Sequence, residues 1–379
     1  MSVSVKQVVS VIEDLAPLRL AEEWDNVGLL VGSYGNSVNR VLLALDITEE
    51  AVDWALKLEC DLIIAHHPVI FRPLKALRTD LPQGRILEKL IRSGLSVYAA
   101  HTNWDKCQSG TSRRLAELLG LSNVSVLKTM GQSKNYKLVV FVPGSHRDAV
   151  FQAMSAAGAG HIGGYSHCSF YAQGKGTFMP RAGAQPYLGR VDELAHVEEV
   201  RLEVVVPEQK LPMVLKGLRA AHPYEEAAYD VIELHNAGLV YGLGCIGELT
   251  PPLAWPEFSS LLRNLFPAAR VAGRMPAEVH KVAVCGGAGA ELLHLAHATK
   301  AEVLVTGDVG HHHALEAEAL GMAVVDAGHY ATEAFLLQDW HTLLTKFAHS
   351  KQLPLEFHIF SPKRSLFSDL HLTRTNAIM

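Results

Sequence analysis

Short apolar runs without polar alternation are the feature that most constrains how this chain folds. Three of them occupy the first third of the chain: Val41–Asp46, Asp61–Ala65 and Leu95–Ala100. A strand that is buried on both faces has such a run as its sequence, whereas a strand with one solvent-exposed face alternates apolar and polar residues. Helix-like stretches at 49–59, 83–93 and 109–119 separate or follow these runs. Strand–helix alternation of this kind predicts an α/β domain with a mostly parallel sheet.

The last third of the chain returns to the same pattern. Its strand candidates are Val279–Cys285, Glu302–Thr306 and Met322–Asp326, and its helix candidates are 290–299 and 331–346. We expect the N- and C-terminal thirds, residues 1–130 and 238–379, to build one mostly parallel-sheet core domain. The chain ends of such a domain are expected to lie close together.

The middle of the chain contains an internal pseudo-repeat. Its two copies are Lys137–Pro143 and Arg201–Pro207, and the strand candidates that follow them are Tyr165–Tyr171 and Ala228–Leu234. A helical stretch separates each copy from its second strand, so two β-α-β units stand in tandem. This arrangement predicts a ferredoxin-like α+β domain inserted at residues 131–237. Gly174–Gly189, between the copies, is rich in Gly and Pro and is expected to be a loop or a hairpin.

Composition excludes several classes of protein. Apolar residues make up 49% of the 379, which supports a sizeable core, and the formal charge of −5 argues against nucleic-acid binding. No apolar run reaches the ~20 residues of a membrane-spanning helix, so no membrane partner is expected. Five cysteines without a CxxC pair indicate a reducing cytoplasm, with neither a disulfide framework nor a thiolate metal site.

Histidine and carboxylate side chains follow the predicted strands at their carboxyl ends, where open α/β sheets bind ligands. They are His66 and His67 after the second strand, His101 and Asp105 after the third, His311–His313 after Glu302–Thr306, and His329 and Glu333 after Met322–Asp326. Each segment alone has an ordinary interpretation: a turn, a helix cap by Asp105, or an exposed His–Glu pair. Together they predict one cleft that collects all of them.

The spacing and chemistry of these residues favour a metal site. His329 and Glu333 are four residues apart, which places both on one face of a helix. A set of histidines and carboxylates without thiolates suits Zn, Mn or Fe. Even five ligands from these segments would exceed the three or four that bind one zinc ion. Two ions about 3.5–4 Å apart that share a carboxylate and a water would use them. We therefore expect two divalent metal ions.

A glycine-rich turn, Gly286–Gly289, follows the strand at Val279–Cys285. Its backbone N–H groups and the helix after it can hold a phosphate. The run matches neither the P-loop nor the full dinucleotide motif, so a tight turn without a ligand is the alternative.

Several of these segments together resemble the Nif-three-like family, whose members are often named GTP cyclohydrolase 1 type 2 homologues. They are AEEWDNVGLLVG (21–32), LIIAHHPVIFRPLK (62–75), HTNWD (101–105), TGDVGHHHALEAEALG (306–321) and DAGHYATE (326–333). The middle third, with GAGHIGGYSHCSF (158–170) and AHPYEEAAYD (221–230), is similar to the PII- and CutA-like insert of the longer bacterial members.

The resemblance implies a dinuclear metal centre and names its ligands by motif. These would be His66, His67, Asp105, His329 and Glu333. It also implies a ring-shaped homohexamer. The run Gly310–His313 departs from the Lys-Tyr-His-Asp run of relatives, and only His312 keeps its identity.

Two functions are compatible with these expectations. In the first, the metals generate hydroxide, which attacks C8 of a purine nucleotide such as GTP and leads to release of formate. His101 or His312 would carry protons, and Gly286–Gly289 would hold phosphate. In the second, the centre is non-catalytic, and the PII-like insert docks a small ligand or a protein partner in a regulatory role.

Overall fold

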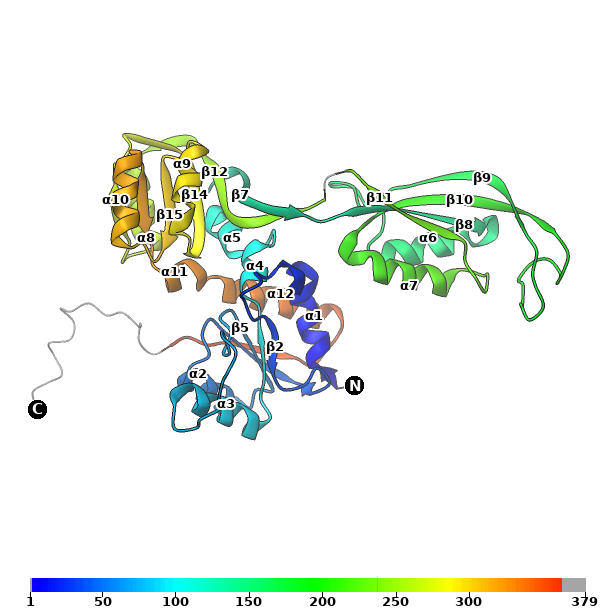
Figure 1. Cartoon of the computed structure of the whole chain (residues 1–379), viewed down its shortest axis with the longest axis horizontal. Coiled ribbons are helices and arrows are strands. Elements are labelled where there is room, and N and C mark those ends of the chain that lie inside the picture. The colour runs from blue at the N-terminus through cyan, green and yellow to red at the C-terminus, as the bar shows by residue number, and fades with distance from the viewer. Residues whose placement is uncertain (1, 237, 363–379) are drawn as a thin grey trace, which may run out of the picture. The chain divides into compact units, whose positions relative to one another are not determined.

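The computed structural model describes residues 2–236 and 238–362 (Figure 1). Of these, residues 2–129 and 241–362 belong to one compact unit, the larger unit, and residues 130–236 and 238–240 belong to a second, the smaller unit. In the described residues no helix combines the length and apolar character needed to cross a membrane. All five cysteines are free.

The first sheet of the larger unit has five strands in the order β17-β4-β5-β6-β2. Their bounds are Glu356–Ile359, Arg40–Ala44, Leu62–Ala65, Ser96–Ala99 and Gly28–Val31. The first four strands are mutually parallel, and β2 is antiparallel to β6. A two-stranded sheet of β1 (Val3–Ser4) and β3 (Ser37–Val38) lies before β4 in the chain.

Helices cover both faces of the first sheet, which explains its uninterrupted apolar runs. On one face Val41, Leu43 and Ile64 pack with α1 (Val5–Leu15) and α12 (Leu336–Ser350). On the other face Leu42 and Ile63 pack with α2 (Glu49–Lys57) and α3 (Pro82–Ser93). Successive side chains of a strand point to opposite faces, which explains why Val41–Ala44 of β4 and all four residues of β5 are apolar. The short helices η1 (Leu18–Leu20) and α4 (Thr102–Lys106) complete this half.

The second sheet of the larger unit has six strands in the order β13-β16-β15-β14-β12-β7. Their bounds are Arg270–Gly273, Ala323–Asp326, Val303–Gly307, Glu278–Ala288, Val240–Ala254 and Ser122–Gln132. The three central strands β14, β15 and β16 are parallel. The accompanying helices are α5 (Thr111–Leu118), α8 (Trp255–Leu265), η4 (Ala290–Leu292), α9 (Leu293–Ala298), α10 (His311–Leu320) and α11 (His329–Glu333).

The outer thirds of the chain exchange elements between the two sheets. Strand β17, near the C-terminal end of the described residues, joins the first sheet beside β4, while β7 from the first third joins the second sheet. The expectation of one long helix over 331–346 is wrong: it is divided into α11 and α12. Helix α11 packs on β14 and β15, whereas α12 packs on β4, β17 and α1, so the break lies where the chain passes from the second sheet to the first.

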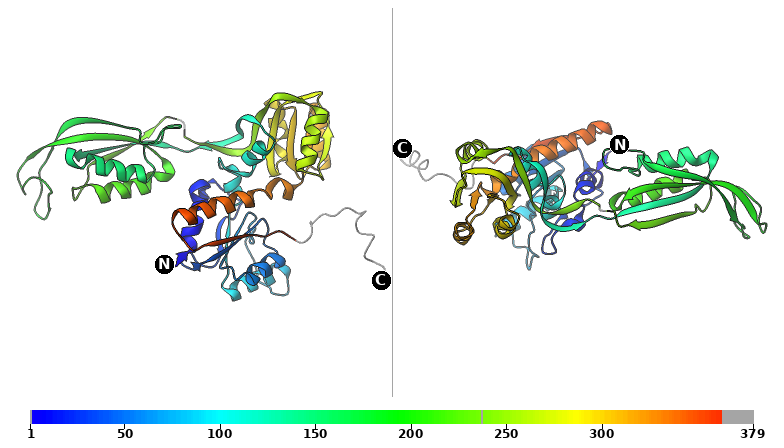
Figure 2. Two further views of the ribbon diagram at one scale, coloured as in Figure 1. Left: turned by 180° about the vertical axis from the view of Figure 1, so that it is seen from behind. Right: turned by 90° about the horizontal axis from the view of Figure 1, so that it is seen from above.

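The smaller unit is a four-stranded antiparallel sheet in the order β11-β8-β10-β9. The strands are Tyr229–Leu234, Asn135–Pro143, Ala195–Pro207 and Ser169–Phe178, with helices η2 (Gly144–His146), α6 (Arg147–Ala156), η3 (Glu208–Lys210) and α7 (Leu211–Ala221). Helices α6 and α7 lie side by side on one face of the sheet (Figure 2). They bury the apolar side of β8 and β10, including Val140, Leu202 and Val204.

Part of the region expected to be a loop or a hairpin is strand. β9 continues to Phe178 and pairs there with Ala195 of β10, so the hairpin alternative holds for this segment. The strand also begins at Ser169, later than the expected Tyr165.

The strands that lead into and out of the smaller unit are neighbours, which makes its removal testable. β7 and β12 are adjacent in the six-stranded sheet, and a side chain at Gly242 of β12 would collide with the Lys128 carbonyl oxygen of β7. Joining Thr129 to Tyr241 through a short Gly/Ser linker is therefore expected to leave a folded larger unit that still binds metal. Circular dichroism, tryptophan fluorescence and metal content of the shortened chain test this. Aggregation of the shortened chain beside a soluble full-length control would contradict it.

Candidate metal centre

The functional residues follow the carboxyl ends of parallel strands from both sheets of the larger unit. Ala44, Ala65 and Ala99 lie in one row across β4, β5 and β6, and Thr306 pairs with Asp326 across β15 and β16. Because parallel strands end at the same edge of a sheet, the residues that follow them gather there. The segments after β5, β6 and β16 supply four histidines.

Four imidazole rings form one cluster. The ring centres of His66 and His67 are 5.0 Å apart, those of His66 and His101 are 5.1 Å apart, and His67 lies 5.4 Å from both His101 and His329. The His67 ring is therefore close to the rings of all three other histidines. His66 is fully buried, while His67 and His101 are partly buried.

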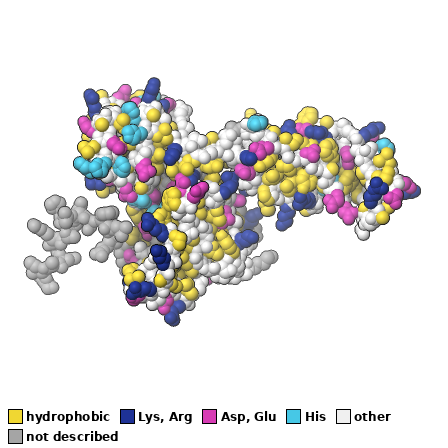
Figure 3. Space-filling view, in the orientation of Figure 1, with side chains coloured by type: hydrophobic (Ala, Val, Ile, Leu, Met, Phe, Trp, Pro, Cys, Tyr) yellow, Lys and Arg dark blue, Asp and Glu magenta, His cyan; other side chains and the backbone are white. Residues whose placement is uncertain are grey.

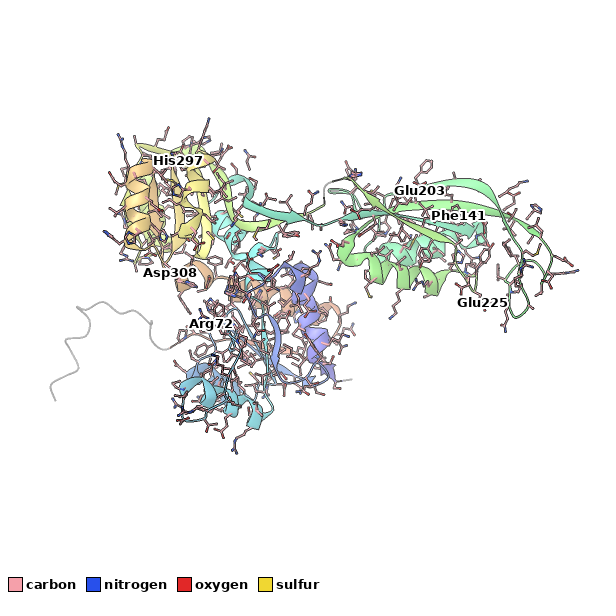
Figure 4. The ribbon with its side chains drawn as sticks, viewed as in Figure 1. Arg72, Phe141, Glu203, Glu225, His297 and Asp308 are labelled. Atoms are coloured by element: carbon pink, nitrogen blue, oxygen red, sulfur yellow. The ribbon has the colours of Figure 1, made fainter. Side chains whose placement is uncertain are left out.

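The Nδ1 atom of every histidine in the cluster lies at hydrogen-bond distance from an oxygen atom. His66 Nδ1 lies 2.8 Å from the Ala100 carbonyl oxygen. The other three face carboxylates: His67 lies 2.9 Å from Asp46, His101 2.9 Å from Asp25, and His329 2.6 Å from Asp308 (labelled in Figure 4). The oxygen beside each Nδ1 accepts a hydrogen bond from the Nδ1–H group, so Nε2 is the nitrogen available to a metal in the cluster. Histidines that bind metals show this arrangement almost without exception.

Glu333 lies among the Nε2 atoms. Its Oε1 is 3.6 Å from His66 Nε2 and 3.4 Å from His329 Nε2, and its Oε2 is 3.3 Å from His67 Nε2. Asp105 Oδ1 lies 3.7 Å from His66 Nε2 and accepts a hydrogen bond from the Thr111 hydroxyl. One buried carboxylate thus reaches three imidazoles, as a ligand shared between two ions would.

The charges of the cluster shift its pKa values. Burial alone would lower the pKa of His67, but the adjacent carboxylates of Asp46 and Glu333 outweigh burial and raise that pKa to about 10. Burial alone would raise the pKa of Glu333, but His66 and His67 lower it, so the carboxylate is ionised. For Asp25, hydrogen bonds from His101 and Thr102 overcome burial and lower the pKa to about 2. A metal ion can bind to the ionised Glu333 carboxylate and to the imidazoles around it, and its binding displaces protons from these imidazoles.

The residues present fit a metal. His66 Nε2 and Glu333 Oε2 are buried and have no hydrogen-bond partner, although such orphaned polar atoms are rare in folded proteins. Ligand atoms of His66, His67 and His101 lie within 4.8 Å of one another, and so do those of His67, His329 and Glu333. Each of these two groups of ligand atoms is compact enough to hold one metal ion, and His67 belongs to both. The cluster therefore suits two ions better than one.

Glycines make room for this centre rather than for a phosphate. The N–H groups of Gly286, Gly287 and Gly289 donate to the hydroxyls of Ser112, Thr332 and Thr306, at 3.2, 3.0 and 2.9 Å. The expectation that Gly286–Gly289 holds an anion is therefore wrong, because three of its four donors are already used. A Cβ at Gly287 would collide with Glu333 Oε1, and one at Gly307 would lie 2.7 Å from the His329 backbone. The close approach of β14, β15 and α11 requires both glycines.

Each residue expected at the site has a definite place. His66, His67, Asp105, His329 and Glu333 all belong to the cluster, by the contacts above. Asp105 does not cap the following helix, because the N-cap of α5 is Gly110. His101, expected only as a proton carrier, also meets the distance criterion for a ligand.

His312 is not brought to the cluster. It is exposed near the start of α10, and its ring contact is with His311 at 5.7 Å. His294, His297 and His311 are also exposed on α9 and α10, where Figure 3 shows histidines gathered on the surface. None of these four belongs to a metal-ligand group among the residues that the structure describes. The proton-transfer role of His312 stays a prediction without a supporting contact.

Three acidic residues were missed by the sequence interpretation: Asp25, Asp46 and Asp308, which orient His101, His67 and His329. A usable signal existed for two of them. Asp46 and Asp308 come within two residues of the ends of β4 and β15, at the same sheet edges as the histidines. Asp25 follows no parallel strand, so its place depends on the loop before β2.

A matched pair of glycine variants tests the centre. Gly287 and Gly94 both have left-handed backbones, with φ of +63° and +71°, but no atom lies within 4 Å of a Cβ at Gly94. Gly94→Ala is expected to cost about 1 kcal/mol of stability and to leave metal content unchanged. Gly287→Ala adds the collision with Glu333 and should lose most of the bound metal. Elemental analysis of both proteins measures this, and wild-type metal content in Gly287→Ala would count against the geometry.

Comparison with known proteins places these residues in a family. The sequence profile of Duf34/NIF3 (NGG1p interacting factor 3) matches residues 3–365. A Halalkalibacterium halodurans protein named GTP cyclohydrolase 1 type 2 homolog is 44% identical over 326 residues, which cover 85% of this chain and 87% of that protein. A Bacillus subtilis protein of the same name is 39% identical over 371 residues, covering 97% and 99% of the two chains.

A solved structure extends the likeness to the fold. The crystal structure of a Bacillus cereus protein related to NIF3 superposes with a TM-score of 0.88 at 40% identity, covering 98% of this chain and 100% of that one. The whole chain, with its middle third, is therefore similar to proteins of this kind.

Proposed function

Since the chain belongs to the Duf34/NIF3 family, we propose that its histidine–carboxylate cluster is a dinuclear metal centre and that the protein is a metal-dependent hydrolase of purine nucleotides. The observation that carries the proposal is the cluster itself: four imidazoles whose Nδ1 atoms are all engaged and whose Nε2 atoms surround the buried Glu333.

The ligands divide naturally between two ions. His66, His101 and Asp105 lie on one side of the cluster, and His329 lies on the other. Glu333 lies within 3.6 Å of His66 and His329 on the two sides and of His67, so its carboxylate would be the ligand that two ions share. Zn, Mn and Fe suit this set of imidazole and carboxylate donors.

The charge of the surroundings supports two divalent cations. Five carboxylates touch the four imidazoles: those of Asp25, Asp46, Asp105, Asp308 and Glu333. With neutral histidines their formal charge nearly balances that of two divalent ions. Such ions, when bound, lower the pKa of a shared water so that hydroxide is available near neutral pH.

Residues at the rim of the cluster are suited to a planar base. The indole ring of Trp24 lies 5.7 Å from the Phe71 ring, and both lie 6.3 Å from the His101 ring. Trp24 is 59% exposed and Phe71 is 41% exposed, so their faces are open to a ligand. His101 is held by Asp25 at Nδ1, and its Nε2 either binds metal or moves a proton, because one nitrogen cannot do both at once.

Cations for a phosphate chain lie in the same loop. Arg72 and Lys75 follow Phe71 closely, both are exposed, and no ion pair involves either of them within the described ranges (Arg72 is labelled in Figure 4). We assign them the phosphate-binding role that the glycine turn does not fulfil. Guanidinium and ammonium groups both bind phosphates well.

The predicted architecture belongs to the same proposal. The strand order β11-β8-β10-β9 with two helices on one face supports a ferredoxin-like insert, and the parallel strands β4–β6 and β14–β16 support a mostly parallel core. The homohexamer and the cytoplasmic location stay predictions.

Turnover of GTP tests the enzymatic role. Wild-type protein loaded with Zn, Mn or Fe is expected to consume GTP and water and to release formate with a dihydroneopterin triphosphate, detected by pterin fluorescence after oxidation. The double variant His66→Ala/His329→Ala is expected to be inactive. Equal signals from both proteins would indicate contamination. Absence of turnover by fully metallated wild type with each metal would favour the alternative function, a non-catalytic metal-binding or regulatory protein.

The aromatic rim makes a further prediction. Stacking on an aromatic side chain contributes about 1–3 kcal/mol per base, so Trp24→Ala is expected to raise KM for the nucleotide about tenfold or more. Metal content should not change, because Trp24 is not one of the candidate ligands. Trp54→Ala is the control, because that partly exposed ring contacts Lys57 on α2. Unchanged KM in the Trp24 variant would show that the base binds elsewhere.

A further inference from the structure

A cavity of about 580 Å³ lies within the smaller unit, apart from the metal centre. It lies on the sheet face opposite α6 and α7: Val200 and Leu202 of β10 enter the core beneath those helices, and Glu199 and Arg201, which alternate with them, line the cavity. Phe141 of β8 and the loop after β9 close its sides. Its volume is within the range of about 300–1,000 Å³ typical of small-molecule sites.

Glu199 is a buried carboxylate in this cavity without a cationic partner. The residue is 9% exposed, and no basic nitrogen in the described residues lies within 4.0 Å of its oxygens. The nearby cations are engaged with other acids: Arg201 with Glu203 at 2.8 Å, and Lys175 with Glu198 at 3.3 Å. An ionised carboxylate removed from water without a partner is costly unless a ligand supplies the missing charge.

His222 does not supply that charge. Its Nδ1 accepts a hydrogen bond from the Tyr224 N–H at 3.1 Å, and its Nε2 lies 3.0 Å from the Phe141 carbonyl oxygen. Both ring nitrogens are thus used by the neutral tautomer, which donates from Nε2 and accepts at Nδ1. Burial also lowers the pKa of His222, which favours the same neutral form.

Aromatic rings make up much of the remaining wall. Tyr224 lies 5.8 Å from Phe178 and 6.2 Å from Tyr187, ring centre to ring centre. The Tyr224 hydroxyl is buried and lies beside the Glu199 carboxylate. Ring faces carry partial negative charge and attract cations. The aromatic wall and the buried Glu199 carboxylate therefore both favour a positively charged ligand.

The loop over the cavity is tied in place. The backbone N–H of Gln185 donates to Glu225 Oε2 at 2.9 Å, which joins the loop after β9 to the segment after α7. Figure 4 labels Phe141 on the sheet and Glu225 in that segment. The cavity is thus bounded by hydrogen-bonded elements.

We propose that this cavity binds a small organic cation, a protonated amine carried on an apolar or aromatic body. The ammonium group pairs with Glu199 and the Tyr224 hydroxyl, and the body packs against Phe141, Phe178 and Tyr187. The class follows from the buried acid, which has no cationic partner, and from the rings around it. This site is independent of the metal centre and gives the smaller unit a ligand-sensing role.

A charge series of one molecular shape tests the proposal on the full-length protein. 2-Phenylethylamine, 2-phenylethanol and phenylacetate differ mainly in charge, and calorimetric titration measures their binding. We expect the amine to bind about tenfold or more tightly than the alcohol, and phenylacetate not to bind. Equal binding of amine and alcohol to the wild type, or no binding of the amine, would overturn the proposal.

Three variants locate the site. Glu199→Gln is expected to reduce amine binding to the level of the alcohol. A Cβ at Gly176 would collide with Glu199 Oε2, so Gly176→Ala should abolish binding, whereas Gly174→Ala, two residues earlier on β9, has no atom closer than 4.0 Å and should bind normally. Neither glycine has a left-handed backbone, so the pair is matched in strain. Wild-type amine binding by both Glu199→Gln and Gly176→Ala would overturn the assignment of the site.

Discussion

Glu333→Ala is expected to abolish metal binding at physiological metal concentrations. Glu333 is 3% exposed and lies within 3.6 Å of the Nε2 atoms of His66, His67 and His329. Removing one partner of a buried charged group costs about 3–5 kcal/mol, which corresponds to a loss of affinity of roughly a hundredfold or more. Titration of the metal-free variant with Zn or Mn, followed by calorimetry, measures the loss.

Two further variants separate charge from size and position. Glu333→Gln keeps the shape and one oxygen ligand but not the charge, so it should bind more weakly than wild type and more tightly than the alanine variant. Glu318→Ala on α10 changes an exposed residue and should bind as the wild type does. If Glu333→Ala bound metal with wild-type affinity, the bridging role of this carboxylate would be untenable.

Removal of the metals is expected to lower the midpoint of thermal unfolding of the larger unit by on the order of 15 °C or more. A ligand present at about 1,000 times its Kd stabilises the folded state by ~4 kcal/mol per site, and each kcal/mol shifts the midpoint of a domain this size by ~2–4 °C. The orphaned His66 Nε2 and Glu333 Oε2 would then have no partner. The comparison is between protein with excess metal and protein treated with chelator.

Tryptophan fluorescence makes this measurement specific for the larger unit. All five tryptophans, at positions 24, 54, 104, 255 and 340, belong to the larger unit, and the 130–240 segment has none. Trp340 and His66 lie 6.3 Å apart, so one reporter is beside the centre. Unfolding of the smaller unit, followed by calorimetry, should not depend on metal. Equal fluorescence midpoints with and without metal would show that the centre contributes nothing to stability.

Much of the site could be predicted because it depends on strand ends. His66, His67, His101 and His329 lie within three residues of the ends of apolar runs. The burial of these runs on both faces makes them recognisable as parallel strands, and parallel strands end together. The spacing of His329 and Glu333 is a local property of one helical turn. These features need no knowledge of the tertiary structure, which is why the five expected ligands are found in one cluster.

The features that were missed depend on contacts between distant segments. Asp25 reaches His101 across 76 positions of the chain, and Asp308 reaches His329 across 21. The glycine turn at Gly286–Gly289 has the sequence of an anion site, but its donors are taken by hydroxyls from other elements. The break between α11 and α12 reflects packing on two different sheets, which helical periodicity does not record.

The central claim is that two divalent ions lie among His66, His67, His101, Asp105, His329 and Glu333. Anomalous diffraction from crystals of the metal-loaded full-length protein tests it most directly, with data collected on both sides of the absorption edge of the metal. We expect two anomalous peaks per chain about 3.5–4 Å apart, with Glu333 between them. Absence of any peak at this cluster in protein shown by elemental analysis to contain metal, or peaks only at the exposed histidines of α9 and α10, would contradict it.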